Sequence, residues 1–124
     1  MAKRLEEAHQ ISVVTWFRYQ YPAFKKLLYV IANGENVGAA RMARLKLLGL
    51  VPGMPDLSLA VARQGHHGLF VEMKQPKGHL QKNQVEMHEE LKQQGYKVVT
   101  AYGFDDAKAL ITDYLKIDKL KCVK

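Results

Sequence analysis

The order of hydropathy patterns in the second half of the chain constrains the fold most strongly. Residues 69–74 (LFVEMK) and 97–101 (KVVTA) are short apolar runs typical of strands. Between them, residues 81–94 carry apolar side chains at helical spacing, with Val85, Met87/His88 and Leu91 expected to face inward, and end at a glycine. Two strands joined by a crossover helix pair in parallel. The sequence therefore predicts a β-α-β unit.

A β-hairpin is predicted immediately before this unit. Residues 51–55 contain two prolines and a glycine, which exclude regular structure. Apolar residues then alternate with smaller or polar ones along 57–61, and the loop at 63–68 (RQGHHG) leads into the strand at 69–74. Because the hairpin adds an antiparallel pair to the parallel one, the expected sheet is small and mixed.

Helices are expected to flank this sheet. An amphipathic helix is predicted over residues 3–19, ending before Pro22; its expected inward positions are Leu5, Ala8, Ile11, Val14 and the Trp16/Phe17 pair. Three further elements are expected: a short strand or buried helix end at 27–31, a basic helix at 39–48 that stops at Gly49, and a helix at 105–115 capped by Asp105. The expected class is α/β (α+β), in a single domain over residues 1–124.

Charge and hydropathy restrict the function. The chain has 19 Lys+Arg against 12 Asp+Glu, a formal net charge of +7, and residues 1–55 hold 8 of these bases but only 3 acids. This excess favours a polyanionic partner such as nucleic acid. The longest apolar run, residues 27–32, is six residues long, against about 20 for a membrane helix. With no signal-peptide pattern and a single cysteine, Cys122, a cytoplasmic location is expected.

Three ionisable residues of the predicted hairpin form a candidate metal site. Side chains alternate along a strand, so Glu72 and Lys74 project from the same face, about 7 Å apart. Pairing of the two hairpin strands brings Asp56 beside Glu72. Two carboxylates and a backbone carbonyl are hard oxygen ligands that suit Mg²⁺ or Mn²⁺. A nearby lysine can orient or deprotonate the attacking water. Considered alone, a Glu-x-Lys pattern is more often a solvated ion pair.

Residues 53–56 (GMPD), 72–74 (EMK) and Gln84 together resemble the PD-(D/E)XK nuclease signature. The flanking sequence is similar to the VRR-NUC branch of that family, in particular to short stand-alone bacteriophage members. The features that carry this resemblance, between about residues 6 and 115, are Glu6 and Gln10, Asn33-Gly34, Arg41, RLK at 44–46, Gly49, GMPDL, GLFVEMK, and HLQKNQ before GYKVV.

The resemblance implies a restriction-endonuclease-like core and a divalent-metal-dependent endonuclease. By position, Asp56, Glu72 and the Met73 carbonyl would bind Mg²⁺ or Mn²⁺. Lys74 would act on the attacking water, and Gln84 would support the site from the crossover helix. An acidic residue of the first helix also joins the site in this family. We favour Glu6, because it lies one turn from Gln10 on the same helix face, although Glu7 remains an alternative.

The resemblance also implies the partners. Stand-alone members resemble Holliday-junction resolvases, so we expect a homodimer that cuts branched DNA, in the host-cell cytoplasm if the chain is phage-encoded. The expected phosphate contacts are Arg41, Arg44, Lys46 and Lys77, together with Lys25, Lys26 and Lys82. Two alternatives remain open: a non-catalytic DNA-binding accessory protein on the same fold, and an enzyme that cuts linear duplex at a particular sequence.

Overall fold

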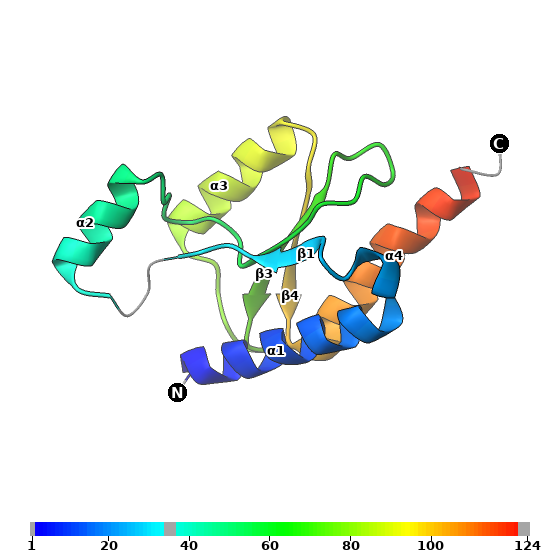
Figure 1. Cartoon of the computed structure of the whole chain (residues 1–124), viewed down its shortest axis with the longest axis horizontal. Helices are drawn as coiled ribbons and strands as arrows, with labels where there is room; N and C mark the ends of the chain where they lie inside the picture. Colours follow the sequence, from blue (N-terminus) through cyan, green and yellow to red (C-terminus); the bar gives the residue numbers. More distant parts are fainter. Residues whose placement is uncertain (1, 34–36, 122–124) are drawn as a thin grey trace.

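The computed structural model describes residues 2–33 and 37–121, and its centre is a four-stranded mixed sheet (Figure 1). The strands, in their spatial order, are β1 (Leu28–Val30), β2 (Leu57–Leu59), β3 (Leu69–Lys74) and β4 (Lys97–Tyr102). β1 pairs antiparallel with β2, and β2 with β3, whereas β3 and β4 are parallel. The predicted mixed sheet is therefore confirmed, and residues 27–31 contain a strand rather than a helix end.

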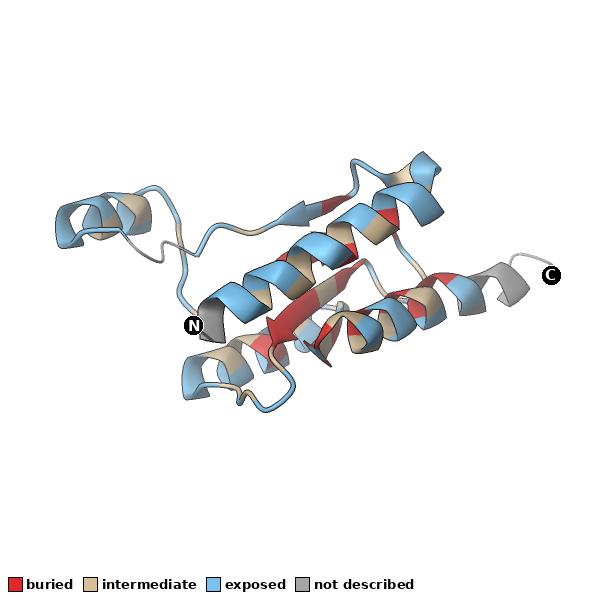
Figure 2. Cartoon of the chain, turned by 90° about the horizontal axis from the view of Figure 1, so that it is seen from below, coloured by how far each residue is buried: buried red, intermediate tan, exposed pale blue. Residues whose placement is uncertain are grey.

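Helices cover both faces of the sheet. α1 (Ala2–Gln20) and α4 (Phe104–Lys121) pack against each other on one face, and Figure 2 shows the largely buried strand β3 between them. α3 (Lys82–Gln93) is the predicted crossover helix and lies against the opposite face. A short 3₁₀ turn (Pro22–Phe24) links α1 to β1.

The hydrophobic core lies between the sheet and the α1/α4 layer. Leu69, Val71 and Met73 alternate along β3 and are fully buried there, as strand periodicity requires. From the helices, α1 contributes Val13 and Phe17 to this core, and α4 contributes further buried side chains. The Phe17 ring also packs on the Tyr21 ring, and Trp16 makes edge contacts with both rings. The other face of β3, which carries Glu72 and Lys74, is thereby directed away from this core.

The predicted inward face of α1 is wrong in part. Leu5 and Ile11 are more than half exposed, whereas Val13 and Phe17 are fully buried. The inward stripe continues toward the N-terminus through Gln10 and Glu6, which are partly buried. These positions share one helix face, but the side chains on that face change from apolar to polar along the helix. A prediction based on apolar residues alone therefore put the inward face of α1 in the wrong place.

The inward face of α3 differs from the prediction in the same way. Val85, expected to face inward, is 45% exposed, whereas His88, also expected to face inward, is buried. Gln84 and Leu91 are partly buried on the same side as His88, so this part of the prediction holds. The face of α3 that meets the sheet is thus largely polar.

The predicted cap of α4 is also different. The helix begins at Phe104, so Asp105 lies inside its first turn. The backbone N–H of Phe104 donates to Nδ1 of His9, at 2.9 Å, and Asp106 accepts from the N–H of Tyr102. A side chain from α1 therefore satisfies the start of α4.

α2 (Ala39–Leu47) lies apart from the sheet (Figure 1), and none of its residues is buried. Its predicted stop is confirmed: Gly49 follows the helix with a φ of +112°, a conformation that favours glycine. Gly34–Asn36 of the preceding segment and Cys122 fall outside the described residues. Within residues 2–33 and 37–121, no helix is long and apolar enough to cross a membrane.

Candidate active site

Asp56 and Glu72 lie together where β2 begins beside β3. The antiparallel register pairs Leu57 with Val71. Asp56, one residue before Leu57, therefore lies opposite Glu72, one residue after Val71. The Asp56 Oδ2 atom accepts a hydrogen bond from the backbone N–H of Met73, at 2.7 Å. Glu72 itself is only 2% exposed. The hairpin therefore brings the two predicted carboxylates together, and β3 holds Asp56 through its backbone.

The electrostatics of this pair favour a cation. Burial, followed by the charge of Glu72, raises the pKa of Asp56 to about 7. The N–H of Met73 opposes this rise, while a hydrogen bond shared with Glu72 and the charge of Glu6 add to it. Adjacent carboxylates of this kind share a proton unless a positive charge replaces it. The same field would stabilise a bound divalent cation.

α3 holds Glu72 from the other side through two side chains one turn apart. Gln84 Nε2 donates to Oε2 of Glu72 at 3.3 Å, and Nε2 of His88 lies 3.2 Å from Oε1. The Gln84 amide is itself oriented, because its Oε1 accepts from the backbone N–H of Gln81 at 2.8 Å. The predicted Gln84 is thus in contact with the site. The role of His88 was missed, although its position four residues after Gln84 was a usable signal.

The first helix reaches Asp56 from the core side. A hollow of about 220 Å³ is lined by Glu6, Glu7 and Gln10 of α1, by Asp56 and Met73, and by residues 30–33. Glu6 is partly buried and raises the pKa of Asp56, whereas Glu7 is exposed. Both acids therefore lie near the site, and the charge of Glu6 is the one that raises the pKa of Asp56.

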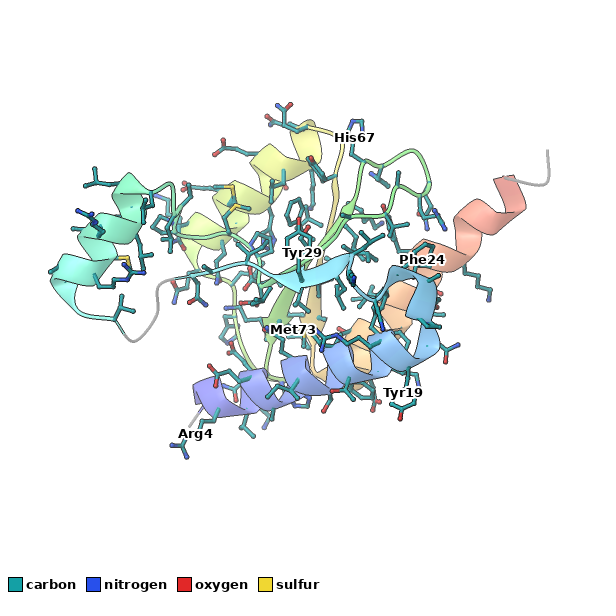
Figure 3. All side chains as sticks on the ribbon, viewed as in Figure 1. Arg4, Tyr19, Phe24, Tyr29, His67 and Met73 are labelled. Carbon is teal, nitrogen blue, oxygen red and sulfur yellow. The ribbon has the colours of Figure 1, made fainter. Side chains whose placement is uncertain are left out.

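Met73 and Lys74, the two residues that follow Glu72 at the end of β3, point to opposite faces of the sheet. Figure 3 shows Met73 between β1 and α1, and its side chain is buried in the core. Lys74 follows it and is 8% exposed, on the face of β3 that carries Glu72. Its carbonyl oxygen accepts from the N–H of Gly103. A largely buried lysine on the same strand face as Glu72 differs from the solvated ion pair that the short motif alone suggests.

Comparison with known proteins identifies this arrangement. The model of the VRR-NUC domain matches residues 4–105. The chain belongs to the VRR-NUC family. A solved structure titled "VRR_NUC domain protein" superposes with a TM-score of 0.80 at 27% identity, covering 91% of this chain and 89% of the other. No curated protein matches the chain. The family is a nuclease-type family of DNA-processing domains, so the predicted family and fold are confirmed.

The residues of this VRR-NUC domain suit a hard, oxygen-liganded cation. Within residues 2–33 and 37–121, no three side chains of His, Cys, Asp or Glu gather closely enough to hold a metal ion by themselves. The oxygen donors at hand are the Asp56 and Glu72 carboxylates and the Met73 carbonyl. Mg²⁺ is often bound by one or two carboxylates and keeps several waters, which matches so small a donor set. The fit is therefore to Mg²⁺ or Mn²⁺ rather than to zinc.

The basic residues expected to contact phosphates lie outside the carboxylate cluster. Arg41, Arg44 and Lys46 are exposed on α2, and Lys77 is exposed in the loop after β3. The ring of the loop residue His67 packs on Tyr96, and the backbone N–H of His67 donates to the carbonyl of Gly95. It therefore fastens the hairpin loop to the end of α3.

Proposed function

We propose that this VRR-NUC domain is a divalent-metal-dependent endonuclease that hydrolyses phosphodiester bonds in branched DNA. The observation that carries the proposal is the convergence of Asp56 and Glu72, with the raised pKa of Asp56; the largely buried Lys74 lies on the same face of β3 as Glu72. A DNA-binding module has no use for buried carboxylates that repel phosphate. A site that binds a cation between protein and phosphate requires them.

Each residue has a role in this mechanism. Asp56, Glu72 and the Met73 carbonyl would hold Mg²⁺ or Mn²⁺, and the cation would supply Lewis-acid chemistry to the phosphate and to the attacking water. Lys74 orients the attacking water and accepts its proton or stabilises the developing negative charge. Gln84 fixes Glu72, and Glu6 adds a third negative charge at the α1 side. Phosphates beyond the cut are held by Arg41, Arg44, Lys46 and Lys77.

The oligomeric state and the biological setting belong to the same proposal. One chain presents one such site, so symmetrical cutting of two strands requires a homodimer with twofold symmetry. The likeness to stand-alone bacteriophage members suggests a phage protein acting in the host-cell cytoplasm. Light scattering after gel filtration measures the mass in solution, and a monomer at working concentration would contradict this part of the proposal.

Cleavage of a synthetic four-way junction and a flap substrate in Mg²⁺ or Mn²⁺ tests the activity. We expect Lys74→Ala to abolish cutting, while the matched variant Lys92→Ala, which removes an exposed lysine of α3, retains it. Chelation with EDTA should stop the reaction. Salt-dependent binding without cutting in any metal would instead support the non-catalytic accessory protein. Cutting that persists in Lys74→Ala would overturn the assigned site.

A further inference from the structure

Three adjoining hollows form one groove between α1 and β1. The first is the hollow beside Asp56, of about 220 Å³. A second, of about 290 Å³, shares Gln10 and Val30 with it, and a third, of about 540 Å³, shares Arg18, Leu28 and Val30 with the second. We call this the α1–β1 groove. It starts at Asp56 and is lined along its length by residues of α1 and β1, the two elements labelled in Figure 1.

The chemistry of the groove changes along its length. Its first hollow contains the acids Glu6, Glu7 and Asp56. No Asp or Glu lines either of the other two hollows. Its far end is instead lined by three cations, Arg18, Lys25 and Lys26. All three are exposed, and none is paired with a carboxylate in the part of the chain that the structure describes.

The middle of the groove is apolar and open to solvent. Ile11 is 66% exposed and Val30 is 63% exposed, although neither contributes to the core. Val14 and Leu28 line the same hollow. Tyr29, also exposed and labelled on β1 in Figure 3, borders the second and third hollows. Exposed apolar side chains gathered in a groove indicate a contact surface.

These features select one class of ligand. Arg18 lies twelve residues after Glu6 along the helix, a span of about 18 Å, which equals about five phosphates of a stacked strand. A duplex keeps its bases inside and presents sugar and phosphate, so it matches the cations but not the apolar floor. An unpaired strand offers both phosphates and exposed base faces, and such grooves combine positive charge with apolar or aromatic surfaces.

We propose that the α1–β1 groove binds an unpaired DNA strand and leads it to the Asp56/Glu72 site. Arg18, Lys25 and Lys26 hold its phosphates, and its bases lie over the apolar middle. The proposal rests on the proposed nuclease function and narrows its substrate class. Among branched DNAs, those with an unpaired arm next to the cut, such as flaps, are then preferred to a fully paired four-way junction.

Binding measured without metal tests the groove independently of cleavage. Fluorescence anisotropy would compare a labelled oligothymidylate with a duplex of the same length, in EDTA. For Arg18→Ala/Lys25→Ala/Lys26→Ala we expect the affinity for the single strand to fall about tenfold, and its log–log salt slope to shrink by about 2, because about three phosphate contacts are lost. The affinity for the duplex should change much less.

The matched control removes the same charge elsewhere. Lys92→Ala/Lys97→Ala/Lys116→Ala replaces three exposed lysines on α3, β4 and α4 and should bind both DNAs as the wild type does. A second pair tests the apolar middle: Ile11→Glu should weaken single-strand binding by repelling phosphate, whereas Val85→Glu, at an exposed site on α3, should not. Equal losses in groove and control variants would overturn the proposal.

The two proposals fail in different ways. If the wild type cuts a flap substrate in Mn²⁺ and the groove variant binds the single strand as tightly as the wild type, the groove proposal is wrong and the nuclease function stands. If the wild type cuts nothing, yet the groove variant loses single-strand binding selectively, the groove stands as a binding site and the nuclease function is wrong. Circular dichroism of each variant confirms that it is folded.

Discussion

Nε2 of His88 lies 3.2 Å from Oε1 of Glu72, and both side chains are almost completely buried. Since Gln84 contacts the second oxygen of the same carboxylate, α3 fixes the orientation of Glu72 through two groups one turn apart. A metal ligand held in this way is already oriented before the cation binds. His88 is therefore a positioning residue of the proposed site, and it acts through Glu72.

Replacing His88 tests this relationship. For His88→Ala we expect Mn²⁺ affinity, measured by calorimetry, to fall by about 10- to 100-fold, the usual cost of losing a group that orients a ligand. His88→Gln, which keeps a donor near Oε1, should recover part of this loss. His66→Ala, in the hairpin loop, serves as the control. Unchanged metal affinity in His88→Ala, with a folded spectrum, would exclude the positioning role.

The sequence predicted the elements that bring the site together. The hairpin and the crossover helix follow from strand periodicity, turn residues and helix stops. Together they place Asp56, Glu72, Lys74 and Gln84 near one another. The choice of Glu6 over Glu7 rested on its spacing from Gln10. In the structure, Glu6 is the one of the two that acts on the pKa of Asp56. Their chemical roles stay predictions.

Hydropathy alone could not predict the polar parts of the buried faces. On α1 the stripe that faces the sheet ends in Gln10 and Glu6; on α3 it includes Gln84 and His88, of which helical spacing had already placed His88 inward. A pattern search that counts apolar residues shifts such a stripe onto exposed neighbours such as Ile11 and Val85. The His9 cap of α4 could not be predicted from the sequence either, since it joins residues 95 positions apart.

Gly53 controls how closely the turn before Asp56 approaches α3. Its φ is +93°, and a Cβ at this position would lie 2.7 Å from the backbone oxygen of Asn83. We expect Gly53→Ala to lower the free energy of unfolding by more than the roughly 1–2 kcal/mol cost of the left-handed conformation itself. It should also reduce cleavage, because Asp56 must move when the turn shifts. Urea unfolding measures the first effect.

Gly65 provides the matched control for this clash. Its φ is +80°, yet no atom lies within 4 Å of an added Cβ. Gly65→Ala therefore carries the conformational strain without the steric contact, and it lies in the hairpin loop away from the carboxylates. Equal destabilisation of the two variants would mean that the approach to Asn83 contributes nothing.

The hydrogen bond from Phe104 N–H to His9 Nδ1 joins the start of α4 to α1. His9→Ala leaves this partly buried donor without its acceptor, so we expect the free energy of unfolding to fall by about 1–2 kcal/mol. The exposed Ser12→Ala, one turn further along α1, is the comparison. Amide exchange of Phe104 should accelerate in His9→Ala alone; an unchanged exchange rate would show that the cap does not stabilise this helix end.

Asp56 gives the metal-free protein a distinctive pH dependence. Its pKa is raised to about 7 in the folded chain, against about 4 when unfolded. Between these values the folded state keeps a proton that the unfolded state loses, so stability falls as pH rises. Asp56→Asn cannot ionise and retains an oxygen for the N–H of Met73. Without metal it should be more stable than the wild type by about 2–4 kcal/mol above pH 7, with the difference vanishing toward about pH 4.

Urea unfolding across this pH range, with Asp113→Asn as an exposed control, measures the effect. Addition of Mn²⁺ should reverse the order above pH 7. The wild type gains stability because the cation replaces the proton shared by Asp56 and Glu72, while Asp56→Asn gains little and loses cleavage. A stability difference that does not depend on pH, or equal stabilisation of both proteins by Mn²⁺, would show that Asp56 neither carries the raised pKa nor binds the metal.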